Sequence, residues 1–470
     1  MPALHDLSAL EQALAVREGR TAAGELVEHY AARIAEHGET VGAFVTLTLD
    51  AARVQAAEVD AAVAAGAPLA PLAGVPIGIK DLNLTAGVPT QLGSPVFAGF
   101  VPTVSDFVVE ALHDAGTVML GKTATPELGL PCYTEPEGAP PARTPFDLSR
   151  SAGGSSGGAA AAVAAGLVPF AQGSDGGGSI RIPASVCGLF GIKPARGRIS
   201  AGPIAGDITG LATNGPLART VRDAAALLDA MAGPRPGDPH WAAPPDQPFL
   251  SVCEQEPGRL RIGRYRDNGL APDGLHPEVV AAWEAASALL SRLGHEVDDL
   301  DAPFDASLLP SFEVVWAVSS AMTPVEPARE GELRPLTRWL RERGRATSAP
   351  EFTAALAAMQ LASRRAIAAT AAYDVVLTPT IGQLPAPVGW FQSAGDPRAE
   401  FDRMVGWTPF TATYNTSGQP AVSVPLSMSR EGLPIGMQLV GRPADEATLL
   451  RLSAQLEQTA PWRDRHPALW

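Results

Sequence analysis

Three lysine residues are the first candidates for chemistry, because the chain uses arginine almost everywhere else. Of its 35 Lys and Arg residues, only Lys80, Lys122 and Lys193 are lysines. Arginine stays protonated in proteins, whereas burial lowers the pKa of lysine from about 10.4 and lets it act as a base. We therefore expect lysine where a guanidinium cannot substitute. Lys80 ends the apolar run of GVPIGIKD, which would supply that burial.

Two tracts rich in glycine and serine lie 24 residues apart, counted from Ser155 to Ser179. The first tract, SAGGSSGG, contains Ser155 and Ser156. The second tract, GSDGGGSIRIP, contains a candidate oxyanion hole: Gly176, Gly177, Gly178 and Ser179. Backbone N–H groups of residues without side chains can converge on a small anion beside a serine hydroxyl. Either tract alone would be typical of a flexible loop, but together with a lysine in apolar sequence they favour a catalytic site.

A phosphate-binding pattern competes with this interpretation. The segment from Gly116 to Thr123, GTVMLGKT, matches G-x-x-x-x-G-K-[ST]. A phosphate-binding loop needs its strand before the first glycine and a helix after the lysine. Here the apolar residues TVML lie between the two glycines, and the loop-like ATPE follows. We therefore expect a strand that ends near Lys122, and no nucleotide site.

The residues from Gly153 to Gly157 also match G-x-S-x-G, the nucleophile elbow of hydrolases with a Ser-His-Asp triad. An elbow needs a strand running directly into it, whereas the preceding TPFDLSRSA is polar and turn-like. None of the eight histidines lies between residues 114 and 239. Four histidines follow that gap and are expected at the surface: His240, His276, His295 and His466. A Ser-His-Asp esterase stays open as the alternative mechanism, because triad partners can be distant in sequence.

The composition is that of a folded globular protein without anionic partners. Hydrophobic residues make up 46% of the 470 residues, charged residues make up 18%, and the formal net charge is -15. Nucleic acids and anionic membranes bind clustered Lys and Arg, so we expect neither as a partner. Asp6 and Glu11 stand where a secretory signal would need positive charge and an apolar run, and no apolar window approaches a membrane span. We therefore expect a cytoplasmic protein.

The three cysteines are Cys132, Cys187 and Cys253. They are too few for a disulfide framework, and they lack the spacing of metal ligands. We expect small buried side chains at these positions. No metal ion and no other cofactor is expected.

Strand-like and helix-like segments alternate along the chain, which predicts an α/β layer fold with a mixed sheet. Helices are expected at residues 7–37, 50–65, 158–166, 219–232, 277–293 and 444–459 and over most of 311–372. Strands are expected at residues 72–80, 115–122, 259–265, 295–300, 373–380, 419–426 and 434–441. The proline-rich stretch 233–258 is expected to be a long surface connection.

On these motifs the chain resembles the amidase signature family. The family's Gly/Ser-rich signature region corresponds to residues 72–232, and NTSGQPAVSVP and GLPIGMQLVGRPADEATLL extend the similarity over nearly the whole length. The resemblance implies a three-layer α/β/α fold around a large mixed, mostly parallel sheet. It implies that Lys80 is the catalytic lysine, that Ser155 is a bridging serine at a cis peptide bond, and that Ser179 is the acylated nucleophile.

The supporting residues implied by the resemblance are Ser156, Asp175 and Arg181, with the last two as an ion pair that shapes the nucleophile loop. Chemically, neutral Lys80 would accept a proton from Ser155, which in turn would accept one from Ser179 as it attacks an amide carbonyl. Water would then cleave the acyl-enzyme. Gly176 departs from the family, which usually carries a side chain there. This glycine could loosen the oxyanion loop or open room for a bulky acyl group.

The expected organisation is a single amidase domain over residues 1–470. Its parts are a helical segment 1–65, the signature core 72–232, a variable and mostly helical substrate-side region 233–372, and strands with a helix at 373–470. The function expected is that of a stand-alone amidase, with pocket residues from about 300–410 and a homodimer as one option for assembly. The alternative is the glutaminase subunit of a tRNA-dependent amidotransferase. Aryl amides, alkyl amides, amide oligomers, carbamates and esters all stay open as substrates.

Overall fold

One sheet of 11 strands runs through the protein. The computed structural model describes residues 3–204 and 208–470. The strands are β1 (Phe44–Leu47), β2 (Pro76–Lys80), β3 (Val118–Thr123), β4 (Phe170–Asp175), β5 (Phe190–Lys193), β6 (Thr213–Ala218), β7 (Arg261–Arg264), β8 (Glu296–Asp299), β9 (Val375–Pro379), β10 (Ala421–Met428) and β11 (Pro434–Gly441). Their order across the sheet is β1-β3-β2-β4-β6-β5-β10-β11-β9-β7-β8.

Helices cover both faces of this sheet. They are α1 (Ala9–Arg17), α2 (Ala23–Val41), α3 (Leu49–Ala64), α4 (Phe107–Asp114), α5 (Gly157–Ala164), α6 (Arg181–Val186), α7 (Val221–Met231), α8 (Phe249–Val252), α9 (Pro277–Arg292), α10 (Leu309–Met322), α11 (Pro335–Ala346), α12 (Ala349–Ala369), α13 (Pro397–Trp407), α14 (Ala412–Ser417) and α15 (Glu446–Thr459). One hydrophobic core joins the sheet to α7, α9 and α15, and a second core joins it to α2, α5 and α6. The expected layered α/β/α architecture is therefore confirmed.

The sheet is mixed, but the expectation that it is mostly parallel is wrong. Parallel pairing is confined to β2 with β3 and β4 and to β7 with β8 and β9. The other six neighbouring pairs within the described residues are antiparallel. Antiparallel neighbours need only a short turn, as between β10 and β11, whereas parallel ones need a crossover. Only β10 and β11 are joined in this way; the other antiparallel neighbours are separated by longer stretches of chain.

Two expected elements differ in detail from the structure. The helix expected over residues 7–37 is divided into α1 and α2, because Gly19 takes a left-handed conformation with φ +66° after the end of α1. The expected surface connection 233–258 contains the short helix α8, whose side chains Phe249 and Val252 are buried. None of the helices in the described part of the chain has the length and hydropathy needed to cross a membrane.

The first Gly/Ser tract leads into a fully buried helix, α5. Every residue of α5 is buried, and a Cβ atom added to Gly158 would clash with the backbone of Ala124. Glycine and alanine therefore allow α5 to approach the sheet closely. This packing holds Ser155 and Ser156, which come just before α5, against the body of the protein.

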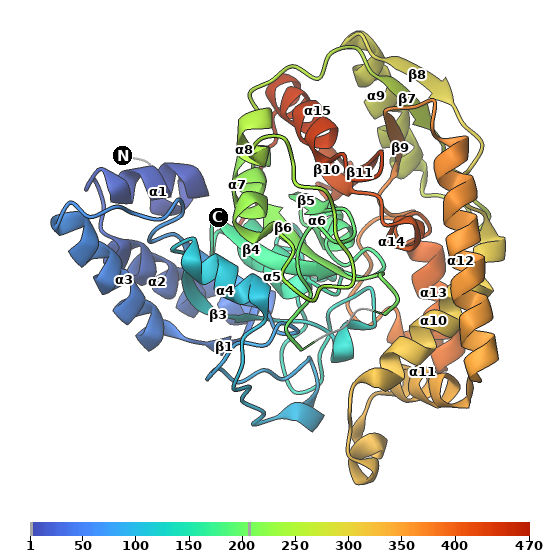
Figure 1. Cartoon of the computed structure of the whole chain (residues 1–470), viewed down its shortest axis with the longest axis horizontal. Coiled ribbons are helices and arrows are strands. Elements are labelled where there is room, and N and C mark those ends of the chain that lie inside the picture. The colour runs from blue at the N-terminus through green and yellow to red at the C-terminus, as the bar shows by residue number, and fades with distance from the viewer. Residues whose placement is uncertain (1–2, 205–207) are drawn as a thin grey trace.

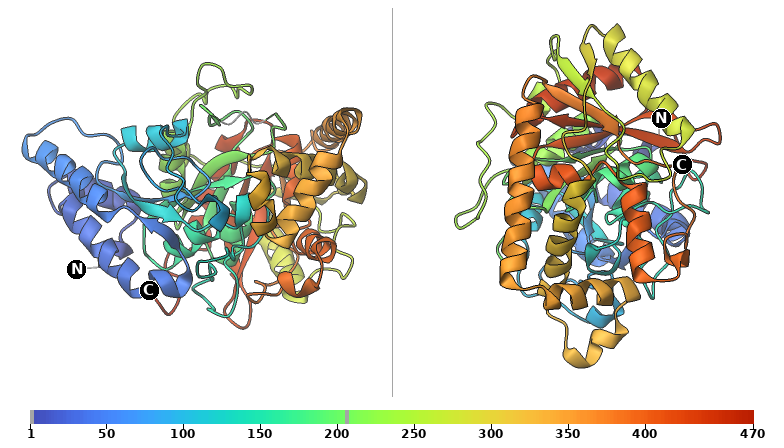
Figure 2. Two further views of the ribbon diagram at one scale, coloured as in Figure 1. Left: turned by 90° about the horizontal axis from the view of Figure 1, so that it is seen from below. Right: turned by 90° about the vertical axis from the view of Figure 1, so that its right-hand side faces the viewer.

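The helices α10 to α13 gather at one end of the molecule, opposite α2 and α3 (Figures 1 and 2). Within this group α10 packs closely against α11. A Cβ atom on Gly344 of α11 would clash with the carbonyl oxygen of Ala317 in α10. Glycine at 344 is therefore required for the contact that positions α10.

We predict that Gly344→Ala destabilises the protein by about 1–3 kcal/mol, because the new methyl group overpacks the contact between α10 and α11. Gly331→Ala is the matched control, since a Cβ atom there would have no neighbour within 4 Å. The control should change the free energy of unfolding by no more than about 0.5 kcal/mol. Denaturant unfolding followed by circular dichroism would measure the free energy of unfolding of both variants. Equal free energies of unfolding would contradict the assigned packing of α10 against α11.

Candidate active site

The candidate catalytic residues meet at the carboxyl ends of two parallel strands. Lys80 is the last residue of β2, and Ser179 follows β4 in the loop that leads to α6. The strands β2 and β4 are parallel neighbours, so both chain segments leave the sheet at the same edge, where ligands bind in α/β folds. Ser155 lies just before α5, and its Oγ is 2.8 Å from Nζ of Lys80.

Lys80 lies in an environment that favours the neutral amine. Its side chain is fully buried, and this burial lowers the pKa of Lys80 to about 7, although the negative charge of Asp175 opposes the shift. Besides Ser155, Nζ donates to the carbonyl oxygen of Ser174 at 3.1 Å and contacts the Ser174 hydroxyl at 3.0 Å. A neutral Lys80 can therefore take a proton from the serine hydroxyl next to it.

The segments that carry Ser155 and Ser179 are joined through Ser156. The N–H of Ser156 donates to the carbonyl oxygen of Ser179 at 3.1 Å, and the Ser156 hydroxyl bonds to both the N–H and the carbonyl group of Ser174. The peptide bond between Gly154 and Ser155 is cis, as the resemblance implied. Within the described structure the hydroxyls of Ser155 and Ser179 are not hydrogen bonded to each other, and such contacts often form only when substrate is bound.

A buried ion pair holds the nucleophile loop at both of its ends. Asp175 ends β4 and Arg181 begins α6. Nε and Nη2 of Arg181 each donate to the Asp175 carboxylate at 2.9 Å, and neither side chain is exposed. Burial alone would raise the pKa of Asp175, but the guanidinium of Arg181 holds it well below its usual range. The expected ion pair is therefore present, and it is charged.

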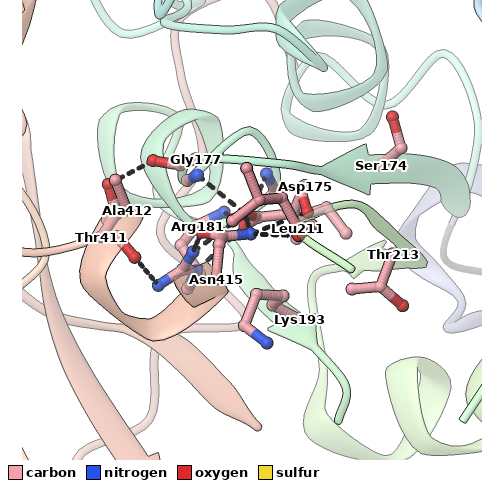
Figure 3. A network of polar contacts seen from close by, with 12 residues as sticks. Ser174, Asp175, Gly177, Arg181, Lys193, Leu211, Thr213, Thr411, Ala412 and Asn415 are labelled. Carbon is pink, nitrogen blue, oxygen red and sulfur yellow. Dashed lines mark hydrogen bonds and ion pairs between the residues drawn. The ribbon is translucent and has the colours of Figure 1, made fainter. Parts of the chain in front are cut away.

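The same arginine binds three residues far away in the sequence, two of which, Thr411 and Asn415, are labelled in Figure 3. Its remaining donor capacity goes to the carbonyl oxygen of Thr411 at 2.9 Å, Oε1 of Gln438 at 2.7 Å and Oδ1 of Asn415 at 2.6 Å. Asn415 in turn donates to the backbone and side chain of Asp175. Sequence reasoning identified neither these partners nor Ser174. Asn415, Gln438 and Ser174 do lie in segments singled out by the sequence, NTSGQPAVSVP, GLPIGMQLVGRPADEATLL and GSDGGGSIRIP.

One of the four expected oxyanion donors is already used within the protein. The N–H of Gly178 donates to Asp175 Oδ1 at 2.7 Å, so the expectation that it binds an oxyanion is wrong for this conformation. Gly178 instead shapes the loop, because its φ is +129° and a Cβ atom there would clash with Thr411. The N–H groups of Gly176, Gly177 and Ser179 donate to no acceptor among the described residues. They are left as the candidate donors.

Gly176 lies against the aromatic ring of Trp316 from α10. A Cβ atom at this position would come within 3.4 Å of the Trp316 ring. Trp316 therefore occupies the space that a larger side chain would take up. The sequence suggested that Gly176 could loosen the oxyanion loop or make room for a bulky acyl group, and Trp316 limits both effects. Ser179 itself is 7% exposed and lies on the wall of a cavity that Trp316 also lines.

The other two lysines serve the packing of the sheet. Lys122 lies inside β3, where Nζ donates to the carbonyl oxygen of Asn83 and to Thr90 Oγ1 and lies 3.7 Å from Asp81. The expected strand is thus confirmed at the phosphate-binding pattern. Lys193 ends β5, and its Nζ donates to the carbonyl oxygen of Pro194 at 3.0 Å.

No histidine is found among the described residues that line the cavity at Ser179. His276 caps the start of α9, and His295 accepts a hydrogen bond from the N–H of Leu260. The polar stretch before Ser155 contains only isolated bridges in place of the strand that an elbow requires. The geometry of this part of the chain therefore gives no support to a Ser-His-Asp triad.

Comparisons with known proteins agree with this geometry. The Amidase family model matches residues 25–450. The 6-aminohexanoate-cyclic-dimer hydrolase of Paenarthrobacter ureafaciens is 37% identical over 98% of this chain and 96% of its own length. Among solved structures, a 6-aminohexanoate cyclic dimer hydrolase covers 100% of both chains with a TM-score of 0.92 and 34% identity. A bacterial aryl acylamidase of the amidase signature family covers 99% of this chain and 98% of its own with a TM-score of 0.89 and 26% identity. This chain therefore belongs to the amidase signature family.

Proposed function

We propose that this chain is a stand-alone amidase that hydrolyses a carboxylic amide through an acyl-enzyme on Ser179, with Ser155 and Lys80 as its proton relay. The observation that carries the proposal is the 2.8 Å contact between Nζ of Lys80 and Oγ of Ser155. It joins a fully buried lysine to a serine, and Ser156 ties that serine's segment to Ser179. The net reaction converts an amide and water into a carboxylic acid and an amine.

In the acylation step, Oγ of Ser179 attacks the amide carbonyl carbon and gives its proton to Ser155, which gives its own proton to neutral Lys80. The carbonyl oxygen becomes an oxyanion and accepts hydrogen bonds from the N–H groups of Gly176, Gly177 and Ser179. When the C–N bond breaks, the protons move back along the relay to the leaving nitrogen. The products of this step are the free amine and an ester on Ser179.

In the deacylation step, water attacks the ester carbonyl carbon and gives a proton to the same relay. A second oxyanion forms in the same position, so the donors of the loop serve both halves of the reaction. Collapse of this intermediate breaks the bond to Ser179, whose oxygen recovers a proton from the relay. The carboxylic acid then leaves, and Lys80 is again neutral.

The whole chain, residues 1–470, acts as one domain in this proposal, since a single sheet connects the relay to the helices that line the cavity. Ser156, Asp175 and Arg181 act as positioning residues. The cytoplasmic location and the homodimer stay predictions.

We predict that Ser179→Ala lowers kcat by about 10³- to 10⁶-fold, because the acyl-enzyme can no longer form. Ser291→Ala, on the exposed end of α9, is the control and should keep wild-type rates. A fluorophosphonate should label the wild-type peptide that carries Ser179, as measured by mass spectrometry. If Ser155 were labelled in place of Ser179 and Ser179→Ala were still active, Ser155 would be the nucleophile and the role assigned to Ser179 would be wrong.

Lys80 should set the pH dependence of hydrolysis. Its pKa is about 7, so it is a charged ammonium group below that pH and a free base above it. The rate should therefore rise through neutral pH and stay high at mildly alkaline pH. Lys80→Arg and Lys80→Ala should both lower the rate by about 10²- to 10⁴-fold relative to the wild-type enzyme, since a guanidinium cannot accept the proton.

Chemical rescue provides the control for this prediction. Methylamine should restore part of the activity of Lys80→Ala, where the side chain leaves space, and none of that of Lys80→Arg. Initial rates over a pH series with and without the amine would measure this. Wild-type rates in Lys80→Arg would show that Lys80 is only a structural cation.

A further inference from the structure

The cavity next to Ser179 has apolar walls. The space between its walls, part of it open to solvent, is about 730 Å³. Its apolar walls include side chains from the segment before Cys132, from α10 and from α13: Leu130, Leu309, Phe312, Trp316, Phe401 and Val405. Among the described residues that line it, none is Asp, Glu, Lys, Arg or His. A charged group in this cavity would therefore find no counter-ion on its walls.

The apolar wall begins directly at the nucleophile loop. The rings of Phe312 and Trp316 are stacked, with centroids 5.4 Å apart and an interplanar angle of 19°. A Cβ atom on Gly176 would come within 3.4 Å of Trp316, and one on Gly177 within 3.8 Å of Phe312. The carbon atoms nearest to a carbonyl group held by this loop would therefore meet aromatic rings.

None of the four charged residues of α13 is among the described residues that line the cavity. Phe401, Val405 and Thr408 follow one another at spacings of four and three, so they share the face that lines the cavity. Asp402 instead pairs with Arg398 at 3.0 Å. The guanidinium of Arg403 lies over the ring of Trp390, 5.1 Å from its centroid. Glu400 accepts a hydrogen bond from the hydroxyl of Tyr133. Neither the charged residues of this helix nor these partners are among the described residues that line the cavity.

The one buried carboxylate of α10 that adjoins these walls, Glu313, is also neutralised within the protein. It forms ion pairs with Arg343 at 2.8 Å and with Arg398 at 3.0 Å. It follows Phe312 in the sequence but does not line the cavity. Burying an unpaired charge is costly, so a substrate that brings a charge into the cavity would be bound poorly.

We infer that this enzyme selects amides whose acyl group is uncharged and apolar, whether alkyl or aryl. This inference rests on the proposed function and adds the substrate class to it. The acyl group stays bonded to Ser179 while the amine leaves and water enters, so the cavity that adjoins Ser179 holds the acyl group. The ammonium and carboxylate groups of glutamine would find no charged partner on the walls of this cavity. The inferred substrate class therefore differs from that of an amidotransferase glutaminase.

Two 4-nitroanilides with the same leaving group test the inference. Heptanoic and 6-aminohexanoic 4-nitroanilide have chains of equal length that end in a methyl group or in an ammonium group. We expect kcat/KM to be at least 100-fold higher for the heptanoyl compound, because its terminal group needs no counter-ion. We also expect no release of ammonia from L-glutamine. Equal values for the two anilides, a preference for the ammonium compound, or hydrolysis of glutamine would overturn the inference.

A pair of variants tests whether charge is the cause. Val405 is partly buried on the cavity wall. Val405→Asp adds a carboxylate there, and Val405→Asn adds a neutral group of nearly the same shape. We compare kcat/KM for the heptanoyl anilide, divided by kcat/KM for the 6-aminohexanoyl anilide. This ratio should fall at least tenfold in Val405→Asp and stay unchanged in Val405→Asn. Equal changes in both variants would overturn the assignment of the cavity to an uncharged acyl group.

Labelling of Ser179 by a fluorophosphonate separates this inference from the proposed function. Each variant should still be labelled, which reports a folded site without use of an amide substrate. If Ser179 is labelled and the charged anilide is hydrolysed as fast as the neutral one, only the substrate class is wrong. If Ser179 is not labelled and neither anilide is hydrolysed by the wild-type protein, the proposed function fails as well.

Discussion

The bidentate ion pair between Asp175 and Arg181 is the interaction on which the rest of the site depends. Both side chains are fully buried, and the guanidinium also binds Thr411, Asn415 and Gln438. One arginine thereby joins β4, α6, α14 and β11. Removing one member of such a pair leaves an uncompensated buried charge, which typically costs about 3–5 kcal/mol. The shape of the nucleophile loop is therefore coupled to the stability of the whole sheet.

The catalytic and selective parts of the site follow from this fixed loop. Because Asp175 holds the N–H of Gly178, only the N–H groups of Gly176, Gly177 and Ser179 are left as candidate oxyanion donors in the proposed mechanism. Trp316 lies against Gly176, at a distance that leaves room for a methyl group but not for a larger side chain. Lys80 lies on β2, which is a neighbour of β4, and its burial there lowers its pKa. Rigid elements thus position the proposed proton relay, the candidate oxyanion donors and the apolar wall.

The candidate reacting groups were easier to find in the sequence than the elements that hold them. Lys80 and the two Gly/Ser tracts are local signals of unusual residue types. The strands β4 and β6, with sequences FAQGSD and TNGPLA, were missed because strands buried on both faces show no alternation and these contain glycine or proline. The contact of Arg181 with Asn415 spans 234 residues, so no local pattern could predict it. The direction of the Gly178 N–H is a property of backbone geometry that residue types do not reveal.

The most direct test of this account is a crystal structure of the protein after phosphonylation of Ser179. The tetrahedral phosphonyl group imitates the intermediate, so its oxygen reports where the oxyanion is bound. We expect this oxygen to accept hydrogen bonds from the N–H groups of Gly176, Gly177 and Ser179. Gly178 should keep its hydrogen bond to Asp175, and Ser155 should lie between Lys80 and Ser179. An oxygen bound by the N–H of Gly178, with the bond to Asp175 broken, would contradict this expectation.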